Sequence, residues 1–231
     1  MIALLFALIL PRFAPCAHGL DEPRPKLTRE HKAETAAIIR AVVRETGGDD
    51  EFADLLVLVA ARESTLQRGL VHRLPADLDA NARAWRRLAP LYQDNPAAAH
   101  PTLWQGYGLF GMNAPIFLQI WSRAADPRVL CDAVVDVLVY RTAAERVLRR
   151  AGKSVPCPGG RHVLRGTWLE VHGAVSRGTL CPRDDADFRR RAGRAGLDVD
   201  RPIMIRAVGQ APAHPVAFVA DFWRRWSARA S

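Results

Sequence analysis

The sequence has few aromatic residues and no charge-free run long enough to cross a membrane at its start. Aromatic side chains make up 7% of the 231 residues, whereas 49% are hydrophobic and 25% are charged. These values lie close to the average of soluble globular proteins and exclude a disordered, collagen-like or polytopic membrane chain. The uncharged stretch at residues 1–10 is far shorter than the about 20 residues of a membrane-spanning helix.

The first residues are typical of a secretory signal. The apolar stretch 1–10 is followed by Pro11, Arg12 and a run of small residues that offers a cleavage region near Ala17. We therefore expect a signal peptide at residues 1–19 and an exported protein, periplasmic or extracellular, at the cell wall. A buried N-terminal element is the alternative, and lipid modification of Cys16 is disfavoured by Pro15.

The four cysteines are too far apart in sequence for a C-x-x-C metal or redox motif. If Cys16 leaves with the signal, one pair remains to form a disulfide and the third cysteine stays as a buried thiol. We prefer the pair Cys157 and Cys181, because both lie in loop-like segments flanked by proline. Isolated thiols are the alternative.

Almost every patterned segment has helical periodicity, and alternating strand-type runs are scarce, so the predicted class is mainly α. In the clearest segment we expect Asp126 to cap the helix and Pro127 to occupy its first position. The expected helices lie at about residues 28–46, 50–63, 82–92, 127–150, 167–177, 185–195 and 215–229.

Glu63 interrupts a helix face that is otherwise apolar. Leu56, Val59 and Glu63 are spaced i, i+3 and i+7, and so share one face. Burial and the negative end of the helix dipole both disfavour a carboxylate, so we expect the pKa of Glu63 to be raised toward neutrality. A general acid that works near pH 7 needs this property. The alternative is an ion pair with Arg62 or Arg68 that merely ends the helix.

Two motifs, in this order, resemble a known family. The pair Glu63 and Ser64 closes an apolar helix, and the segment 106–113 reads Gly-Tyr-Gly-Leu-Phe-Gly-Met-Asn. Together they resemble the lysozyme-like domain of soluble lytic transglycosylases and goose-type lysozymes. The glycines permit positive φ and a close approach to a sugar, and the apolar side chains offer contacts to it. The candidate substrate-binding residues are Ser64, Gln105, Tyr107, Gly108, Leu109, Phe110, Met112, Asn113 and Tyr140.

The resemblance implies cleavage of the β-1,4 bond between N-acetylmuramic acid and N-acetylglucosamine in peptidoglycan. Glu63 would be the catalytic residue, protonating the glycosidic oxygen and then activating the muramyl 6-hydroxyl, which closes a 1,6-anhydro ring without water. A second carboxylate is then unnecessary. The resemblance also implies that Ser64 orients Glu63, although a serine at a helix end commonly bonds local backbone instead.

Two departures from the family pattern concern the substrate site. Gly111 stands where the family turn usually continues with glutamine, so Asn113 or Gln105 would have to replace that amide. Residues 66–103 form a long insertion that we interpret as a lid or subsite wall. Its acids would either position water for hydrolysis or be solvated loop residues. They are Asp77, Asp79 and Asp94.

A third departure is the loss of the tyrosine that the family carries in a later helix. In this chain Val175 and Ser176 stand at the Tyr-Asn positions. Tyr140 is the candidate that would supply a phenol from another helix, with a core tyrosine as the alternative. His172, in the same segment as Val175, is interpreted as structural.

The formal net charge of +9 predicts attraction to polyanions such as wall material. Arginines beside aromatic residues at 188–191 and 223–226 suggest nucleic acid, but the spacing of Phe222 and Trp226 favours inward packing on an amphipathic helix. We therefore predict a monomeric lytic transglycosylase without metal, cofactor, nucleic-acid partner or membrane span. Its lysozyme-like domain covers residues 20–200, and a C-terminal helical extension at 201–231 packs on it. A muramidase and a silent peptidoglycan-binding scaffold are the alternatives.

Overall fold

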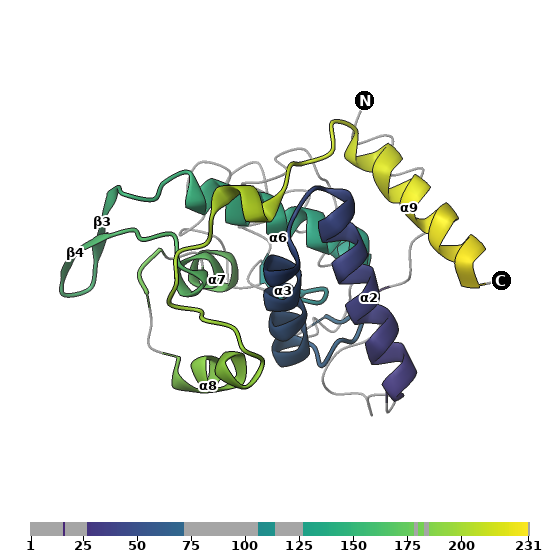
Figure 1. The fold of residues 1–231 in the computed structure, drawn as a ribbon, viewed down its shortest axis with the longest axis horizontal. Helices are drawn as coiled ribbons and strands as arrows, with labels where there is room; N and C mark the ends of the chain where they lie inside the picture. Colours follow the sequence, from purple (N-terminus) through teal and green to yellow (C-terminus); the bar gives the residue numbers. More distant parts are fainter. Residues whose placement is uncertain are drawn as a thin grey trace.

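The structure is a computed structural model that describes residues 16, 27–71, 106–113, 127–177, 180–182 and 185–230. In these ranges the chain is mainly helical, with two small antiparallel hairpins (Figure 1). Several predictions fall on residues that the structure does not describe. They are the signal peptide, of which only Cys16 is described, the helix expected at 82–92, the three acids of the insertion, and Gln105. No helix among the described residues is long and apolar enough to cross a membrane.

Helices α2 (Arg29–Glu45) and α3 (Asp50–Glu63) form the packed pair that carries Glu63. Thr28 caps α2 by accepting from the N–H of His31, and Asp49 caps α3 by accepting from the N–H of Phe52. Side-chain oxygens at this position satisfy donors that a helix start leaves unpaired. Both helices therefore begin and end close to where the sequence predicts.

The prediction of a single helix at 127–150 is wrong for its first residues. The chain forms a 3-10 helix, η4 (Pro127–Cys131), and then α6 (Ala133–Leu148). Asp132 separates them, because its carboxylate accepts from the N–H groups of Val134 and Val135 and so caps α6. The true cap is thus Asp132, six residues after the predicted Asp126. Helix α6 is buried along most of its length.

The Gly-rich segment forms a hairpin of β1 (Gly106–Tyr107) and β2 (Met112–Asn113), fixed to α6 at Asp136. The buried Asp136 carboxylate accepts from the N–H of Leu109 at 2.6 Å and of Phe110 at 3.3 Å. Gly108 is required here: its φ is +74°, and a Cβ would lie 2.3 Å from Oδ2 of Asp136.

A second hairpin, β3 (Ser154–Cys157) with β4 (Gly160–Val163), was not predicted from the sequence. It follows α6 and lies at one end of the molecule (Figure 1). Cys157 bonds Cys181 in a disulfide, which confirms the preferred pair. Helix α7 (Trp168–Arg177) follows, and its Glu170 accepts from the N–H groups of Arg165, Gly166 and Thr167 at its start.

The last helices are α8 (Ala186–Arg194) and α9 (Pro215–Ala230), separated by the 3-10 helix η5 (Ile205–Val208). Helix α9 packs on α6, and the indole N–H of Trp223 donates to Asp132 at 2.8 Å. The segment between α8 and α9 is tied to the turn after α2, because Asp49 donates its N–H to the carbonyl of Ala207.

Cys131 is not the free thiol that the sequence analysis expects. It forms a disulfide with Cys16, so all four cysteines are paired. A chain that begins after Cys16 would lack this bond. Two disulfides are compatible with an oxidising compartment outside the cytosol.

Candidate functional site

Glu63 is the last residue of α3, and its side chain is 26% exposed at the edge of the core. Residues one turn or two turns before it on the same face, Val59 and Leu56, are fully buried. The helix therefore carries an apolar stripe into the core and delivers a carboxylate where that stripe reaches the surface. The predicted position of Glu63 on this stripe is what the structure shows.

The chain reverses sharply directly after Glu63. Thr65 and Leu66 have φ values of +55° and +66°, in the left-handed region that residues other than glycine seldom adopt. The N–H of Leu66 bonds the carbonyl of Ala60 and closes the helix end. Two consecutive strained residues beside a partly buried carboxylate are a feature that clusters at functional sites.

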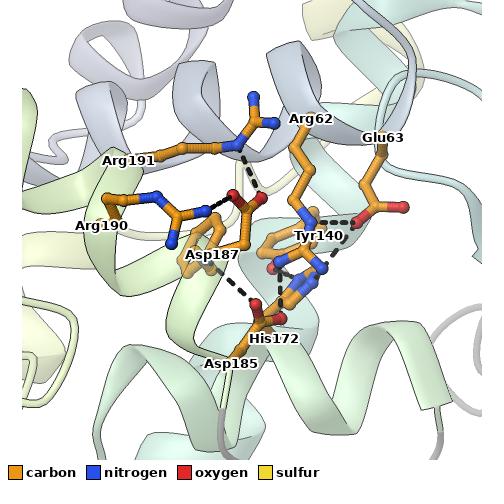
Figure 2. Close-up of polar contacts among 9 residues, drawn as sticks. Arg62, Glu63, Tyr140, His172, Asp185, Asp187, Arg190 and Arg191 are labelled. Atoms are coloured by element: carbon orange, nitrogen blue, oxygen red, sulfur yellow. Dashed lines mark hydrogen bonds and ion pairs between the residues drawn. The ribbon is translucent and has the colours of Figure 1, made fainter.

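Helix α7 places His172 against this carboxylate. Its Nε2 lies 3.6 Å from Oε1 of Glu63, and the histidine is 5% exposed. On the other side of the ring, Nδ1 lies 3.2 Å from the hydroxyl of Tyr140, which comes from α6. Figure 2 shows the three side chains in this order, from three different helices.

Tyr140 is completely buried, with its ring against Phe110 and Trp168. Burial, together with the negative charges of Glu63 and Asp136, raises the pKa of Tyr140 well above its ordinary value. The phenol therefore keeps its proton at neutral pH. Tyr140 has no exposed surface in this structure, and its predicted role in substrate binding stays a prediction.

Arg62 links Glu63 to a second carboxylate. Its Nε lies 3.8 Å from Oε1 of Glu63, and its Nη1 lies 2.6 Å from Oδ2 of Asp185, the N-cap of α8. The guanidinium also lies over the ring of Phe188 at 5.3 Å, an arrangement that holds it in place. Burial acts to raise the pKa of Asp185, but hydrogen bonds from Arg62 and from the N–H of Phe188 outweigh burial and lower it.

Arg62 is shared between two carboxylates, Glu63 and Asp185. One arginine cannot neutralise both of them, and the raised pKa expected for Glu63 stays a prediction. Figure 2 shows one carboxylate oxygen of Glu63 turned toward Arg62 and His172 and the other pointing away from both.

Ser64 takes the alternative role considered for it. Its hydroxyl is fully buried and donates to the carbonyl of Ala60 at 2.8 Å. A serine at a helix end commonly satisfies its own backbone in this way. Glu63 is thus flanked by Arg62 and His172 rather than by the serine that the resemblance suggested.

The apolar residues of the Gly-rich hairpin lie in the core of this structure. Their side chains are at most 1% exposed, and their expected contact with a sugar stays a prediction. They are Tyr107, Leu109, Phe110 and Met112. The backbone of Gly108 is buried with them. The hairpin reaches the site indirectly, because the ring centroids of Phe110 and Tyr140 lie 4.7 Å apart. The side chain of Asn113 is not among those that the structure describes.

Arg62 and Asp185 are not among the candidate site residues that the sequence offers. Arg62 is expected there only as an ion-pair partner of Glu63, and Asp185 lies 123 positions from Arg62, so the sequence gives no signal of their proximity. His172, expected to be structural, lies in the segment that matches the tyrosine helix of the family pattern, and this position is a usable signal. Among the described residues no group of histidine, cysteine, aspartate or glutamate could hold a metal ion.

The chain was compared with protein-family models, with curated proteins and with solved structures, and no match was found in any of the three.

Proposed function

We propose that the protein is a peptidoglycan lytic transglycosylase in which Glu63 is both general acid and general base. The observation that supports this most directly is the setting of Glu63: a partly buried carboxylate at the end of a core helix, near Arg62 and the imidazole of His172. The order of the catalytic helix, the Gly-rich hairpin and the later helices supports the lysozyme-like resemblance, as does their contact around Tyr140.

The chemistry needs one carboxyl group that works twice. Protonated Glu63 donates its proton to the glycosidic oxygen, the bond to C1 of the muramyl sugar breaks, and the N-acetylglucosamine side leaves as an alcohol. The resulting carboxylate accepts the proton of the muramyl 6-hydroxyl while that oxygen bonds C1 and closes the anhydro ring. Glu63 regains its proton, so no water and no second carboxylate are consumed.

Hydrolysis of the same bond by a muramidase is the second candidate, and Asp185 is the observation that favours it. Asp185 shares Arg62 with Glu63, and its lowered pKa favours the ionised form of Asp185. A protonated and an ionised carboxyl group in one site are the usual pair of a glycosidase. A catalytically silent scaffold that binds peptidoglycan is the third candidate.

The proposed activity goes with a proposed location and partner. Two disulfides support export to the periplasm or cell exterior, and the +9 charge supports attraction to an anionic wall. The arginines of α8 are in part neutralised locally, since Arg190 and Arg191 pair with Asp187 on the same helix. We propose a monomer whose partner is the glycan strand.

The test is mass spectrometry of purified peptidoglycan after incubation with the full chain or with Glu63→Gln. We expect anhydromuropeptides from the unmodified protein and a loss of about a hundredfold or more in Glu63→Gln. Glu45→Gln is the matched control, because Glu45 likewise ends a helix and pairs with an arginine, Arg225, away from this cluster.

Each outcome distinguishes the three readings. Anhydro ends that depend on Glu63 support the transglycosylase, and reducing ends that depend on Glu63 support the muramidase. No products from either protein, together with undiminished sedimentation with peptidoglycan, would replace both enzymes by the silent scaffold.

A further inference from the structure

The buried hydroxyl of Tyr140 determines which nitrogen of His172 carries the proton. A buried hydroxyl needs an acceptor for its hydrogen. In the described part of the chain, the hydrogen-bond partner of this hydroxyl is Nδ1 of His172, at 3.2 Å. The phenol stays protonated, as its raised pKa requires, so Tyr140 donates and Nδ1 accepts.

An imidazole that accepts at Nδ1 is neutral and carries its hydrogen on Nε2. Nε2 is the atom that faces Oε1 of Glu63 at 3.6 Å. That separation exceeds a formed hydrogen bond, as catalytic contacts often do before substrate is bound. The stacked ring of Phe188, 5.6 Å away at an interplanar angle of 13°, restricts rotation of the imidazole out of this direction.

We propose that His172 is the positioning residue of Glu63, and that Tyr140 holds it as the tautomer whose Nε2–H is directed at Oε1. This inference deepens the proposed function and rests on it, because it assigns to His172 and Tyr140 the control of the catalytic carboxyl group. An N–H at Oε1 fixes the rotamer of Glu63. Val175 stands where the family pattern has a tyrosine. In this proposal His172, which is held by Tyr140 of α6, takes the place of that tyrosine.

The first experiment does not require activity. Nitrogen-15 NMR of the histidine rings in the full chain reports directly which nitrogen is protonated. We expect His172 to have a protonated Nε2 and an unprotonated Nδ1, and Tyr140→Phe to lose this preference while its ring still packs on Phe110. Exposed His214 is the internal reference and should not respond. A protonated Nδ1 in the unmodified protein would overturn the proposal.

The second experiment uses the release of muropeptides from purified peptidoglycan. We expect His172→Ala to lower kcat by about tenfold to a hundredfold with KM unchanged, the usual effect of losing a hydrogen bond to a charged group. His172→Gln should recover part of kcat, because its amide also offers an N–H. His214→Gln is the surface control.

The two experiments separate the failure of this inference from that of the proposed function. An unchanged kcat in His172→Ala refutes the positioning role in an active enzyme. If the unmodified chain releases no muropeptides, the proposed function fails, and the positioning of Glu63 is then refuted with it even where NMR finds the expected tautomer.

Discussion

Replacing Asp132 by asparagine should remove a pH dependence of folding that the structure builds into the junction of α6 and α9. Asp132 is 2% exposed, and burial raises its pKa to about 6 from an ordinary value of 3.8. Hydrogen bonds from Val135, Trp223 and Val134, with the charge of Arg68, oppose burial without cancelling it. The carboxylate is therefore ionised at pH 7 at a cost in stability.

The magnitude follows from the two pKa values of Asp132. Between pH 3.8 and about 6 the folded protein binds more protons at this site than the unfolded chain, so stability falls as pH rises through this range. A shift of about two units corresponds to a loss of about 3 kcal/mol, complete above pH 6. Below pH 3.8 both states are protonated, and the group contributes no difference.

The assay is urea denaturation of the oxidised protein at pH 3.5 and at pH 7. The loss of unfolding free energy between these pH values should be about 3 kcal/mol greater in the unmodified chain than in Asp132→Asn. The other titrating groups are common to both proteins and cancel in the comparison. Asp49→Asn, which alters the exposed cap of α3, is the control for helix capping. Equal pH dependence in Asp132→Asn and the unmodified protein would refute the reasoning.

Two further substitutions test the fold around the site. Gly108→Ala should destabilise the protein by about 3 kcal/mol or more, measured by denaturant unfolding, because its Cβ would overlap Asp136 and the carbonyl of Leu130 at a positive φ; a loss below about 1 kcal/mol would contradict the close approach. Replacing both Cys157 and Cys181 by serine should cost about 3 kcal/mol by opening a loop with a sequence separation of 24, seen as a lower Tm. An unchanged Tm would show that this bond does not constrain the unfolded chain.

Helix α3 shows how far local sequence determines the site. Asp49 satisfies the first N–H groups, and Leu56 and Val59 point to the core, so the helix and the position of Glu63 follow from periodicity and capping alone. The same rules predict α2, α7, α8 and α9. They fail at 127–150, because two aspartates compete as caps and the sequence does not show which side chain can reach the following N–H groups.

The roles of the hairpin residues could not be predicted in the same way. Tyr107 and Phe110 are apolar enough for either a sugar platform or a core, and the choice depends on what covers them. The structure places them under α6, where Asp136 binds the hairpin backbone. The short β3–β4 hairpin was missed because a pair of four-residue strands leaves too few residues for an alternating pattern.

The sequence by itself determined most of the described helices and one carboxylate on an apolar face, because these depend on neighbours along the chain. It favoured the disulfide between Cys157 and Cys181 only through the proline-flanked segments in which they lie. Tertiary structure alone decided what surrounds that carboxylate. His172 reaches Glu63, and Asp185 reaches its neighbour Arg62, from segments more than one hundred positions away. Hydrogen-bond direction, burial and shared charge exist only between side chains that the fold has brought together, so the environment of Glu63 could not be worked out from its own segment.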